Sequence, residues 1–324
     1  MVSETNEAVD LLRLIEAHGG SADANGWIHL PADLGTGYVR FITPLPGLTL
    51  MLQHYELNKA LAIKRGENKF RNDTLIFSFR NIRAGDAFSQ KPPDGKPAWD
   101  RLPSVQVSTS DIALEIHVPA RIKTSNLIIG IETGILKRLL RGNDDHAVIR
   151  QIVDTRQPYL YEEIVSPRIQ AVAGEIFRAD ASGGLAHFFY RMKAEELIYH
   201  FLSGLMRRGE MPRYAVNQTD IHKIYGVRDR IIAHPEVPPQ LESLARDAYM
   251  SVGKLGKLFR QVFGDSIYNY YQKLRMQQAA FLLREEKLSV SETGYRLGFS
   301  NLSHFTRLFE KHMGMKPKKY SGSV

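Results

Sequence analysis

Apolar residues recur with two different periods along this chain, and the change of period divides it into regions. Between residues 27 and 118, short alternating runs are separated by Gly, Pro, Asn and Asp, which is typical of strands joined by turns. These runs predict an antiparallel sandwich or barrel. The expected strands are Tyr38–Ile42, Leu48–Leu57, Thr74–Phe79, Val105–Ser108 and Ile112–Val118.

Helical spacing of apolar residues predominates from residue 127 onward. A short helix is also expected earlier, over Ala8–Ala17. The longest helix, Leu185–Arg208, carries more apolar residues than a lone surface helix needs, so it either packs on its own N-terminal domain or pairs with a second copy. Other helices are predicted over Leu127–Leu140, Asp144–Val153, Glu162–Phe177 and Gln218–Ala233.

Two near-copies of one pattern occupy the end of the chain, Leu241–Gly264 and Leu288–Gly314. Each predicts a short helix, a tight turn and a longer basic helix with a Leu-Phe pair. Ser251 is expected to cap the longer helix of the first copy, and Asn301 or Ser300 that of the second. Gly298 suits a turn with positive φ, and Met250 is expected to close the other turn. This is the pattern of a helix-turn-helix, whose second helix enters the major groove of DNA.

The segment between the two copies, Ser266–Glu286, contains no Gly or Pro and predicts a single helix. At about 1.5 Å per residue it is roughly 30 Å long, close to the ~34 Å of one turn of duplex DNA. Two recognition helices at its ends can therefore enter two successive major-groove segments on one face of DNA.

Positive charge gathers in the same part of the chain. Residues 218–324 hold 17 Lys and Arg against 10 Asp and Glu, which accounts for +7 of the net charge of +8. Such a distribution favours a polyanionic partner. The candidate DNA contacts are the polar residues opposite the buried stripe of each recognition helix: Ser251, Lys254, Lys257, Arg260, Asn301, Ser303, His304, Thr306, Arg307 and Lys311.

The C-terminal part resembles the AraC/XylS family of bacterial transcription regulators. The resemblance is carried by the residues Ser251, Leu255, Phe259, Gly264, Tyr271, Arg275, Ala279, Leu282, Leu283, the run from Gly298 to Phe309, Gly314, Pro317 and Tyr320. It implies an α+β protein with a cupin-like β-barrel as sensor at 1–125 and a helical dimerisation segment at 126–208. A linker at 209–217 and an all-α domain with two helix-turn-helix units at 218–324 follow.

The same resemblance implies the partners: double-stranded DNA, RNA polymerase, a small-molecule effector and a second copy of the chain, with activation as the usual outcome. The barrel-then-helices order, with Lys193–Leu197 (KAEEL), is most similar to the branch that includes ferric-siderophore-responsive, pyochelin-type regulators. That branch implies an iron chelate or another metabolite as effector.

The chain departs from the family pattern in both recognition units. Thr293 and Gly294 stand where the family usually has Ile and Ala, and a Gly inside a helix costs about 1 kcal/mol relative to Ala. Gly253 and Gly256 occupy positions that often carry a base-reading side chain. Either the first unit reads sequence poorly and the second supplies the specificity, or these glycines let the backbone approach DNA more closely.

Candidate effector-binding residues lie in the strand region. Trp27 and Trp99 could stack on a ligand, Arg40 could meet an anionic group, and His54 and His117 could face a barrel interior; ordinary packing is the alternative for each. The chain has no His-x-His, His-Glu-x-x-His, phosphate-loop or nucleophile-elbow motif, so no metal, cofactor or catalytic residue is predicted. Two alternatives stay open: a cupin-type metalloenzyme fused to a DNA-binding tail, and a ligand-independent regulator.

Composition is that of an ordinary globular protein, with 43% hydrophobic and 24% charged residues and no cysteine. No run of about 20 apolar residues predicts a membrane span, and the acidic N-terminus does not resemble a signal peptide. A cytoplasmic location without membrane contact is expected.

Overall fold

The computed structural model describes residues 10–65, 73–82, 103–110, 112, 114–140, 147–153, 159–179, 183–206, 217–284 and 286–322. The chain divides into two compact units, and the boundary lies between Met206 and Asn217. Of the helices in these ranges, none combines the length and the hydropathy that a bilayer-spanning helix requires.

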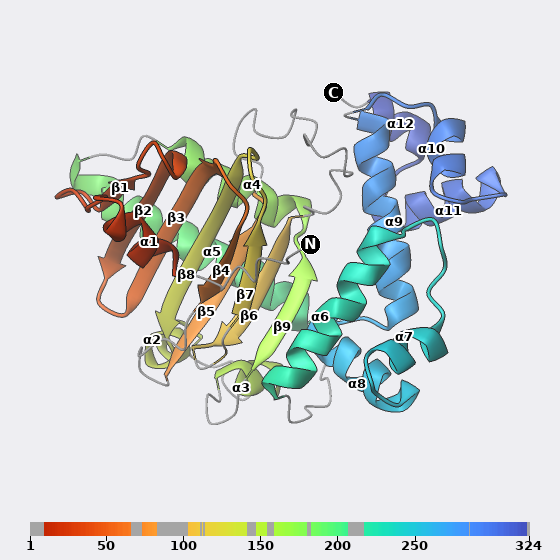
Figure 1. The fold of residues 1–324 in the computed structure, drawn as a ribbon, viewed down its shortest axis with the longest axis horizontal. Coiled ribbons are helices and arrows are strands. Elements are labelled where there is room, and N and C mark those ends of the chain that lie inside the picture. Colours follow the sequence, from red (N-terminus) through yellow and green to blue (C-terminus); the bar gives the residue numbers. More distant parts are fainter. Residues whose placement is uncertain are drawn as a thin grey trace, which may run out of the picture. The chain divides into compact units, whose positions relative to one another are not determined.

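The N-terminal unit is built on an open antiparallel sheet of seven strands (Figure 1). In spatial order the strands are β1 (Trp27–His29), β2 (Gly35–Leu45), β3 (Leu48–Leu57), β8 (Thr124–Glu132), β5 (Thr74–Arg80), β6 (Ser104–Thr109) and β9 (Leu160–Ile164). Two further strands, β4 (Leu61–Arg65) and β7 (Leu114–Val118), form a separate two-stranded sheet. The predicted closed barrel is therefore wrong, because β1 and β9 are the two edges of the larger sheet. Strand and turn spacing alone does not distinguish an open sheet from a closed one.

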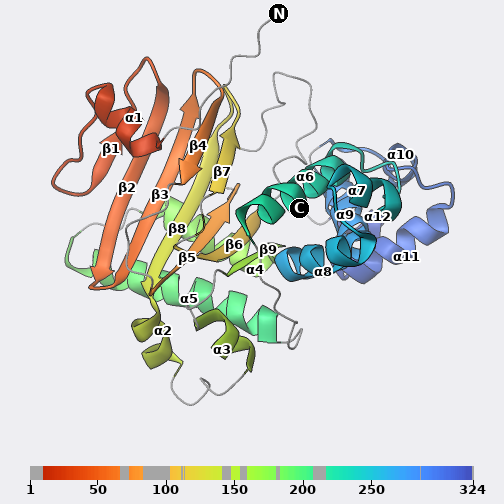
Figure 2. The ribbon, with the colours of Figure 1, turned by 60° about the horizontal axis from the view of Figure 1, so that its bottom comes forward.

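Helices cover one face of this sheet. They are α2 (Thr133–Leu139), α3 (Ala147–Val153), α4 (Pro167–Arg178) and α5 (Ala186–Met206). Helix α5 crosses the strands (Figure 2). Its Tyr190 hydroxyl accepts a hydrogen bond from Arg40 of β2, and the ring of Phe201 packs against Phe77 of β5 and Tyr161 of β9. Alternate residues of β3, such as Leu50, are fully buried under these helices. The opposite face packs on α1 (Leu11–Ala17) and on β4 and β7.

Two segments predicted as helical begin with strands. The helix expected at Leu127–Leu140 is strand β8 up to Glu132 and α2 only afterwards, and the helix expected from Glu162 begins with β9. The Ile-rich run of β8 is buried in the middle of the sheet, where a continuous apolar stretch gives no reliable period. Ser166 caps α4 and Pro167 is its first residue, a start signal that resembles an interruption in the sequence.

A cluster of charged side chains joins α4 to α5. The ammonium of Lys193 lies 2.9 Å from Glu196 and also pairs with Glu175 of α4. Glu196 in turn pairs with Arg168 of α4 at 3.2 Å and lies 3.8 Å from the ring of His200. The charged residues of the Lys193–Leu197 element therefore hold two helices of the N-terminal unit together.

This cluster should make the free energy of unfolding depend on pH in the acid range. The hydrogen bond from Lys193 lowers the pKa of Glu196 below its usual 4.5, so the carboxylate contributes stability above pH 4.5 and loses it as the pH falls through its lower folded-state pKa. Thermal unfolding followed between pH 6 and 3 should show a smaller acid loss for Glu196→Gln than for the natural chain. Identical pH profiles would remove Glu196 from the linkage.

The C-terminal unit consists of seven helices over its described residues: α6 (Gln218–Ala233), α7 (Leu241–Asp247), α8 (Val252–Phe263), α9 (Ile267–Arg284), α10 (Val290–Arg296), α11 (Leu302–Met313) and α12 (Pro317–Gly322). Figure 1 shows α9 running between α7 and α8 at one end and α10 to α12 at the other. The single linking helix predicted between the two copies is therefore confirmed. Its far half packs on the fully buried rings of Phe305 and Phe309 from α11.

Candidate nucleic-acid interface

The two recognition helices, α8 and α11, have the same length and matching ends. Ser251 Oγ accepts a hydrogen bond from the Lys254 backbone N–H at 3.2 Å, and Asn301 Oδ1 accepts from the N–H groups of Ser303 and His304 at 2.9 and 3.1 Å. Each helix ends at a left-handed glycine, Gly264 at φ 72° and Gly314 at φ 76°. The capping roles predicted for Ser251 and Asn301 are confirmed.

The two turns differ in what occupies the left-handed position. Gly298 has φ 76°, as predicted, and a Cβ there would lie 2.8 Å from the carbonyl oxygen of Glu236. The first turn instead places Tyr249 at φ 53°, although Met250 was expected to close it. Tyr249 is 87% exposed, so its strained backbone is not compensated by burial of its ring.

Arg275 of α9 fixes the second turn. Its side chain is buried, Nη2 donates a hydrogen bond to the Leu297 carbonyl, and its guanidinium lies 3.7 Å from the ring centroid of Phe299. Burial lowers the pKa of Arg275 from its ordinary value. The linking helix therefore positions the second unit through a charged contact as well as through apolar packing.

Gly294 allows α10 and α11 to approach closely. A Cβ at this position would lie 2.6 Å from Leu302 Cδ2 and 3.3 Å from Phe305 Cδ1. The neighbouring Thr293 is fully buried, and its hydroxyl has no hydrogen-bond partner among the described residues. The propensity cost expected for Gly294 is therefore offset in part by close helix packing.

The polar residues predicted to contact DNA from α11 share one side of the helix. Ser303, His304, Arg307 and Lys311 are exposed and Thr306 is half-buried. The His304 ring packs edge-on against Phe299 at 5.9 Å, which restrains its orientation. No salt bridge within the described residues occupies Arg307 or Lys311, so both cations are available to a partner.

Helix α8 presents a different surface. Lys257 and Arg260 are exposed, and the space around Gly253 and Gly256 is open. The ammonium of Lys254 lies 2.9 Å from a carboxylate oxygen of Asp220, a buried residue in the first turn of α6. The structure thus places one of the predicted DNA contacts in an ion pair inside the domain.

Three of the five candidate effector residues come together in the N-terminal unit. The Arg40 guanidinium lies 4.4 Å from the Trp27 ring centroid, and its Nη1 donates to the Tyr190 hydroxyl at 2.8 Å. The ring of Tyr38 lies between Trp27 and His54, 4.7 and 5.6 Å from them. Because strands β1, β2 and β3 are adjacent, these side chains form one cluster facing α5.

His54 has a polar contact and an apolar surrounding. Its Nδ1 lies 2.8 Å from Ser125 Oγ, and burial, with a smaller contribution from the charge of Lys123, lowers the pKa of the imidazole. His117 lies on β7, which pairs with β4, and its side chain lies outside the described residues, as does Trp99. The cluster therefore brings together Trp27, Arg40 and His54 of the predicted set.

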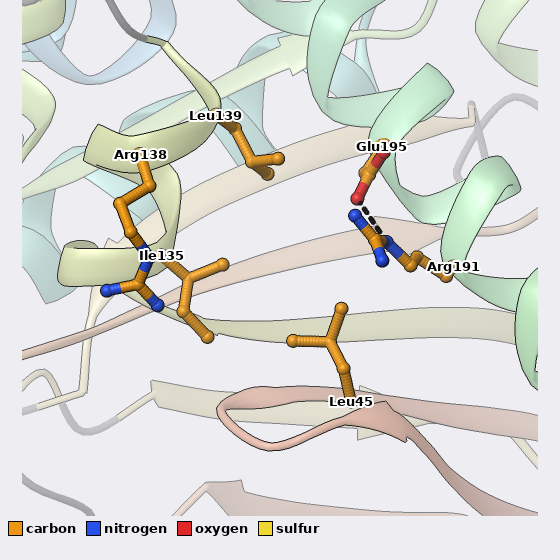
Figure 3. A pocket seen from close by; sticks show the side chains of 6 residues that line it. All are labelled: Leu45, Ile135, Arg138, Leu139, Arg191 and Glu195. Carbon is orange, nitrogen blue, oxygen red and sulfur yellow. Dashed lines mark hydrogen bonds and ion pairs between the residues drawn. The ribbon is translucent and has the colours of Figure 1, made fainter.

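A pocket of about 370 Å³ opens beside α5 (Figure 3). Its lining combines apolar side chains with an ion pair between Arg191 and Glu195 at 2.8 Å. The lining residues are Leu45, Ile135, Arg138, Leu139, Arg191 and Glu195. None of them was a predicted site residue.

Sequence reasoning missed Asp220 and Tyr190 and assigned no role to Arg275. An acidic residue in the first turn of a helix is ordinarily explained by the helix dipole, and nothing in the sequence connects Asp220 with Lys254. Tyr190 lies in the long predicted helix Leu185–Arg208, and nothing in the sequence connects it with Arg40. Arg275 was noted only as one of the fixed-spacing positions that carry the family resemblance, which is a usable signal of a role in the fold.

Residues 244–323 match the family model described as helix-turn-helix domain. Over 157 residues the chain is 32% identical to the regulatory protein PchR of Pseudomonas aeruginosa, covering 43% of this chain and 52% of that protein. Over 80 residues it is 30% identical to the arabinose operon regulatory protein of Salmonella typhimurium, covering 25% and 28%. A solved transcriptional regulator with an AraC-type DNA-binding domain, from Chromobacterium violaceum, is 26% identical over 33% of this chain and 95% of its own, with a TM-score of 0.31.

The match thus spans about half the length of PchR and a smaller share of the arabinose regulator. The C-terminal part of the chain is a helix-turn-helix DNA-binding domain. It is similar to the corresponding part of PchR and of the arabinose operon regulatory protein, both of which are named as regulatory proteins.

Proposed function

We propose that this protein is a sequence-specific DNA-binding transcription regulator of the AraC/XylS type, acting as an activator through RNA polymerase. One observation carries the proposal: two capped recognition helices, α8 and α11, attached to opposite ends of α9. With 18 residues, α9 is about 27 Å long, close to the ~34 Å turn of the duplex. The basic charge of the same domain supplies phosphate contacts.

The second unit supplies most of the base readout in this account. Helix α11 exposes Arg307, the kind of side chain that reads guanine, with Ser303 and His304 on the same side. Helix α8 has glycines at 253 and 256, and a Gly offers no side chain to a base edge. Its Lys257 and Arg260 are suited to phosphate.

Transcription in vitro tests the regulatory role. A template carrying a DNA site selected by the protein should give more transcript with RNA polymerase when the full-length protein is added. A decrease would contradict activation, and no change would contradict a direct regulatory role.

A second copy of the chain is the proposed partner of α5. Three large apolar side chains are exposed along its outer side, Phe188 (65%), Met192 (44%) and Tyr199 (64%), and Leu185 (75%) is exposed directly before it. The N-terminal half of this surface carries Arg191, and Glu195, with which it pairs in the same helix, follows one turn later. An antiparallel pair places opposite charges together, which a two-fold dimer requires of a self-complementary surface. The pocket lined by Leu139 and Arg191 borders this surface (Figure 3).

Replacing Phe188 by Glu should shift the protein from dimer to monomer, since it buries a charge at the centre of the proposed apolar contact. Sedimentation equilibrium should show at least a tenfold weaker dimer. Tyr295→Glu is the matched control, because Tyr295 is 62% exposed on α10 and lies outside this surface. A Phe188→Glu protein that dimerises as well as the control would contradict the assignment.

The N-terminal unit is proposed to bind a small-molecule effector, with the cluster of Trp27, Arg40 and His54 as its candidate site. A cation between aromatic rings suits an anionic or aromatic ligand. Thermal shift of the full-length protein with a panel of iron chelates and metabolites tests this, with Arg40→Met as comparison. A ligand that stabilises the natural chain and not the variant supports the site. DNA affinity unaffected by every compound would instead favour a ligand-independent regulator.

A further inference from the structure

Lys254 has two candidate partners, the carboxylate of Asp220 and a phosphate of DNA. It is the third residue of α8, among the polar side chains predicted to contact DNA, and half of its side chain is exposed. Its ammonium nevertheless lies 2.9 Å from Asp220 Oδ1. The single positive charge of Lys254 is largely balanced by this carboxylate, so it attracts a phosphate less strongly than an unpaired lysine would.

Asp220 is fixed where it meets Lys254. It is 5% exposed, and its backbone N–H donates to Asn217 Oδ1, the cap of α6, at 2.7 Å. Moving Lys254 onto DNA would leave this carboxylate buried without its cation, which is unfavourable. The pair is therefore expected to persist when α8 approaches the duplex.

No other side chain in the first turn of α8 supplies a positive charge in place of Lys254. Val252 is apolar, and Gly253 and Gly256 have no side chains. In α11, by contrast, Arg307 and Lys311 have no acidic partner among the described residues and remain available. Helix α8 also exposes Lys257 and Arg260 further along, so the ion pair removes only Lys254 from its candidate phosphate contacts.

We infer that Asp220 acts as an intramolecular competitor of DNA phosphate and withholds Lys254 from the backbone. This inference rests on the proposed DNA-binding function and extends it to the control of affinity. Asp220 joins α6 to α8 and reduces the phosphate contacts of the first unit by one. The second unit thereby contributes a larger share of the free energy of DNA binding.

The slope of log K against log salt counts phosphate contacts, at about 0.9 per contact. We would measure it for the full-length protein on one duplex by fluorescence anisotropy, with the variants Asp220→Asn, Lys254→Met and the double variant. Asp220→Asn should steepen the slope by about 0.9, because it frees Lys254. Lys254→Met should leave the slope unchanged, and the double variant should match it.

Asp229→Asn is the matched control. It also removes one negative charge from α6 and also releases a cation, but that cation is Arg228, which lies on α6 and is not among the predicted DNA contacts, so the slope should not change. A steeper slope in both Asn variants would reduce the effect to net charge and overturn the inference. A slope flattened by about 0.9 in Lys254→Met, with Asp220→Asn unchanged, would show that Lys254 already contacts phosphate. Thermal unfolding followed by circular dichroism checks that each variant is folded. Salt-independent binding by the natural chain would overturn the proposed DNA-binding function itself.

Discussion

Replacing Arg275 by Met is expected to lower the free energy of unfolding of the C-terminal domain by about 2–3 kcal/mol. Met fills much of the same volume, so packing is largely kept. What is lost is a charged hydrogen bond to the Leu297 carbonyl and the stacking of the guanidinium on Phe299. Arg275 Nε has no hydrogen-bond partner in the described ranges, and removing that buried group offsets part of the loss.

Denaturant unfolding followed by circular dichroism measures this effect. Arg296→Met is the control, because Arg296 pairs with Glu286 at 3.0 Å on an exposed surface, where such a pair contributes at most about 1 kcal/mol. Since Arg275 holds the turn before α11, its loss should also weaken binding to the half-site read by the second unit. Equal stability of the two variants would show that the turn is held by apolar packing alone.

Replacing Arg307 by Ala should lower affinity for the operator by about 1–3 kcal/mol, because a bidentate contact with guanine is lost. The side chain is exposed and no salt bridge in the described part of the chain depends on it, so stability should be unchanged. The loss should be largest at one base pair of the site. Titration of a set of single-base operator variants locates that position.

Lys311→Ala provides the comparison for Arg307→Ala. If Lys311 contacts phosphate, its loss should weaken binding to all sequences alike and flatten the salt slope by about one unit. An Arg307→Ala protein with unchanged affinity and unchanged base preference would remove Arg307 from the readout. The base-reading residue of α11 would then have to be sought at Ser303 or His304.

The C-terminal domain could be predicted in detail because its signals are local. Caps at Ser251 and Asn301, the left-handed Gly298 and the unbroken linking helix each depend on residues a few positions apart. The N-terminal unit was predicted less well. Five strands were found, but β8 was taken for the start of a helix, because its buried apolar run lacks the alternation of a half-exposed strand.

Contacts between distant residues were beyond the reach of the sequence. Trp27, Arg40 and His54 were chosen one by one for their chemistry, and only the pairing of β1, β2 and β3 places them together. Arg40 and its partner Tyr190 are 150 residues apart, and Lys254 and Asp220 are 34 apart. No period or motif connects such pairs, so the cluster around Arg40 and the restraint on Lys254 emerge only from the fold.

Selection of binding sites from random duplex DNA tests the central claim most directly. The full-length protein would be used at one fixed salt concentration, with and without the panel of chelates and metabolites. The account predicts a two-part motif with its parts about one helical turn apart. The part read by α11 should carry the stronger base preference. A single short motif, or two parts equally well defined, would contradict the division of labour between α8 and α11, and the absence of any enriched sequence under all conditions would contradict sequence-specific binding.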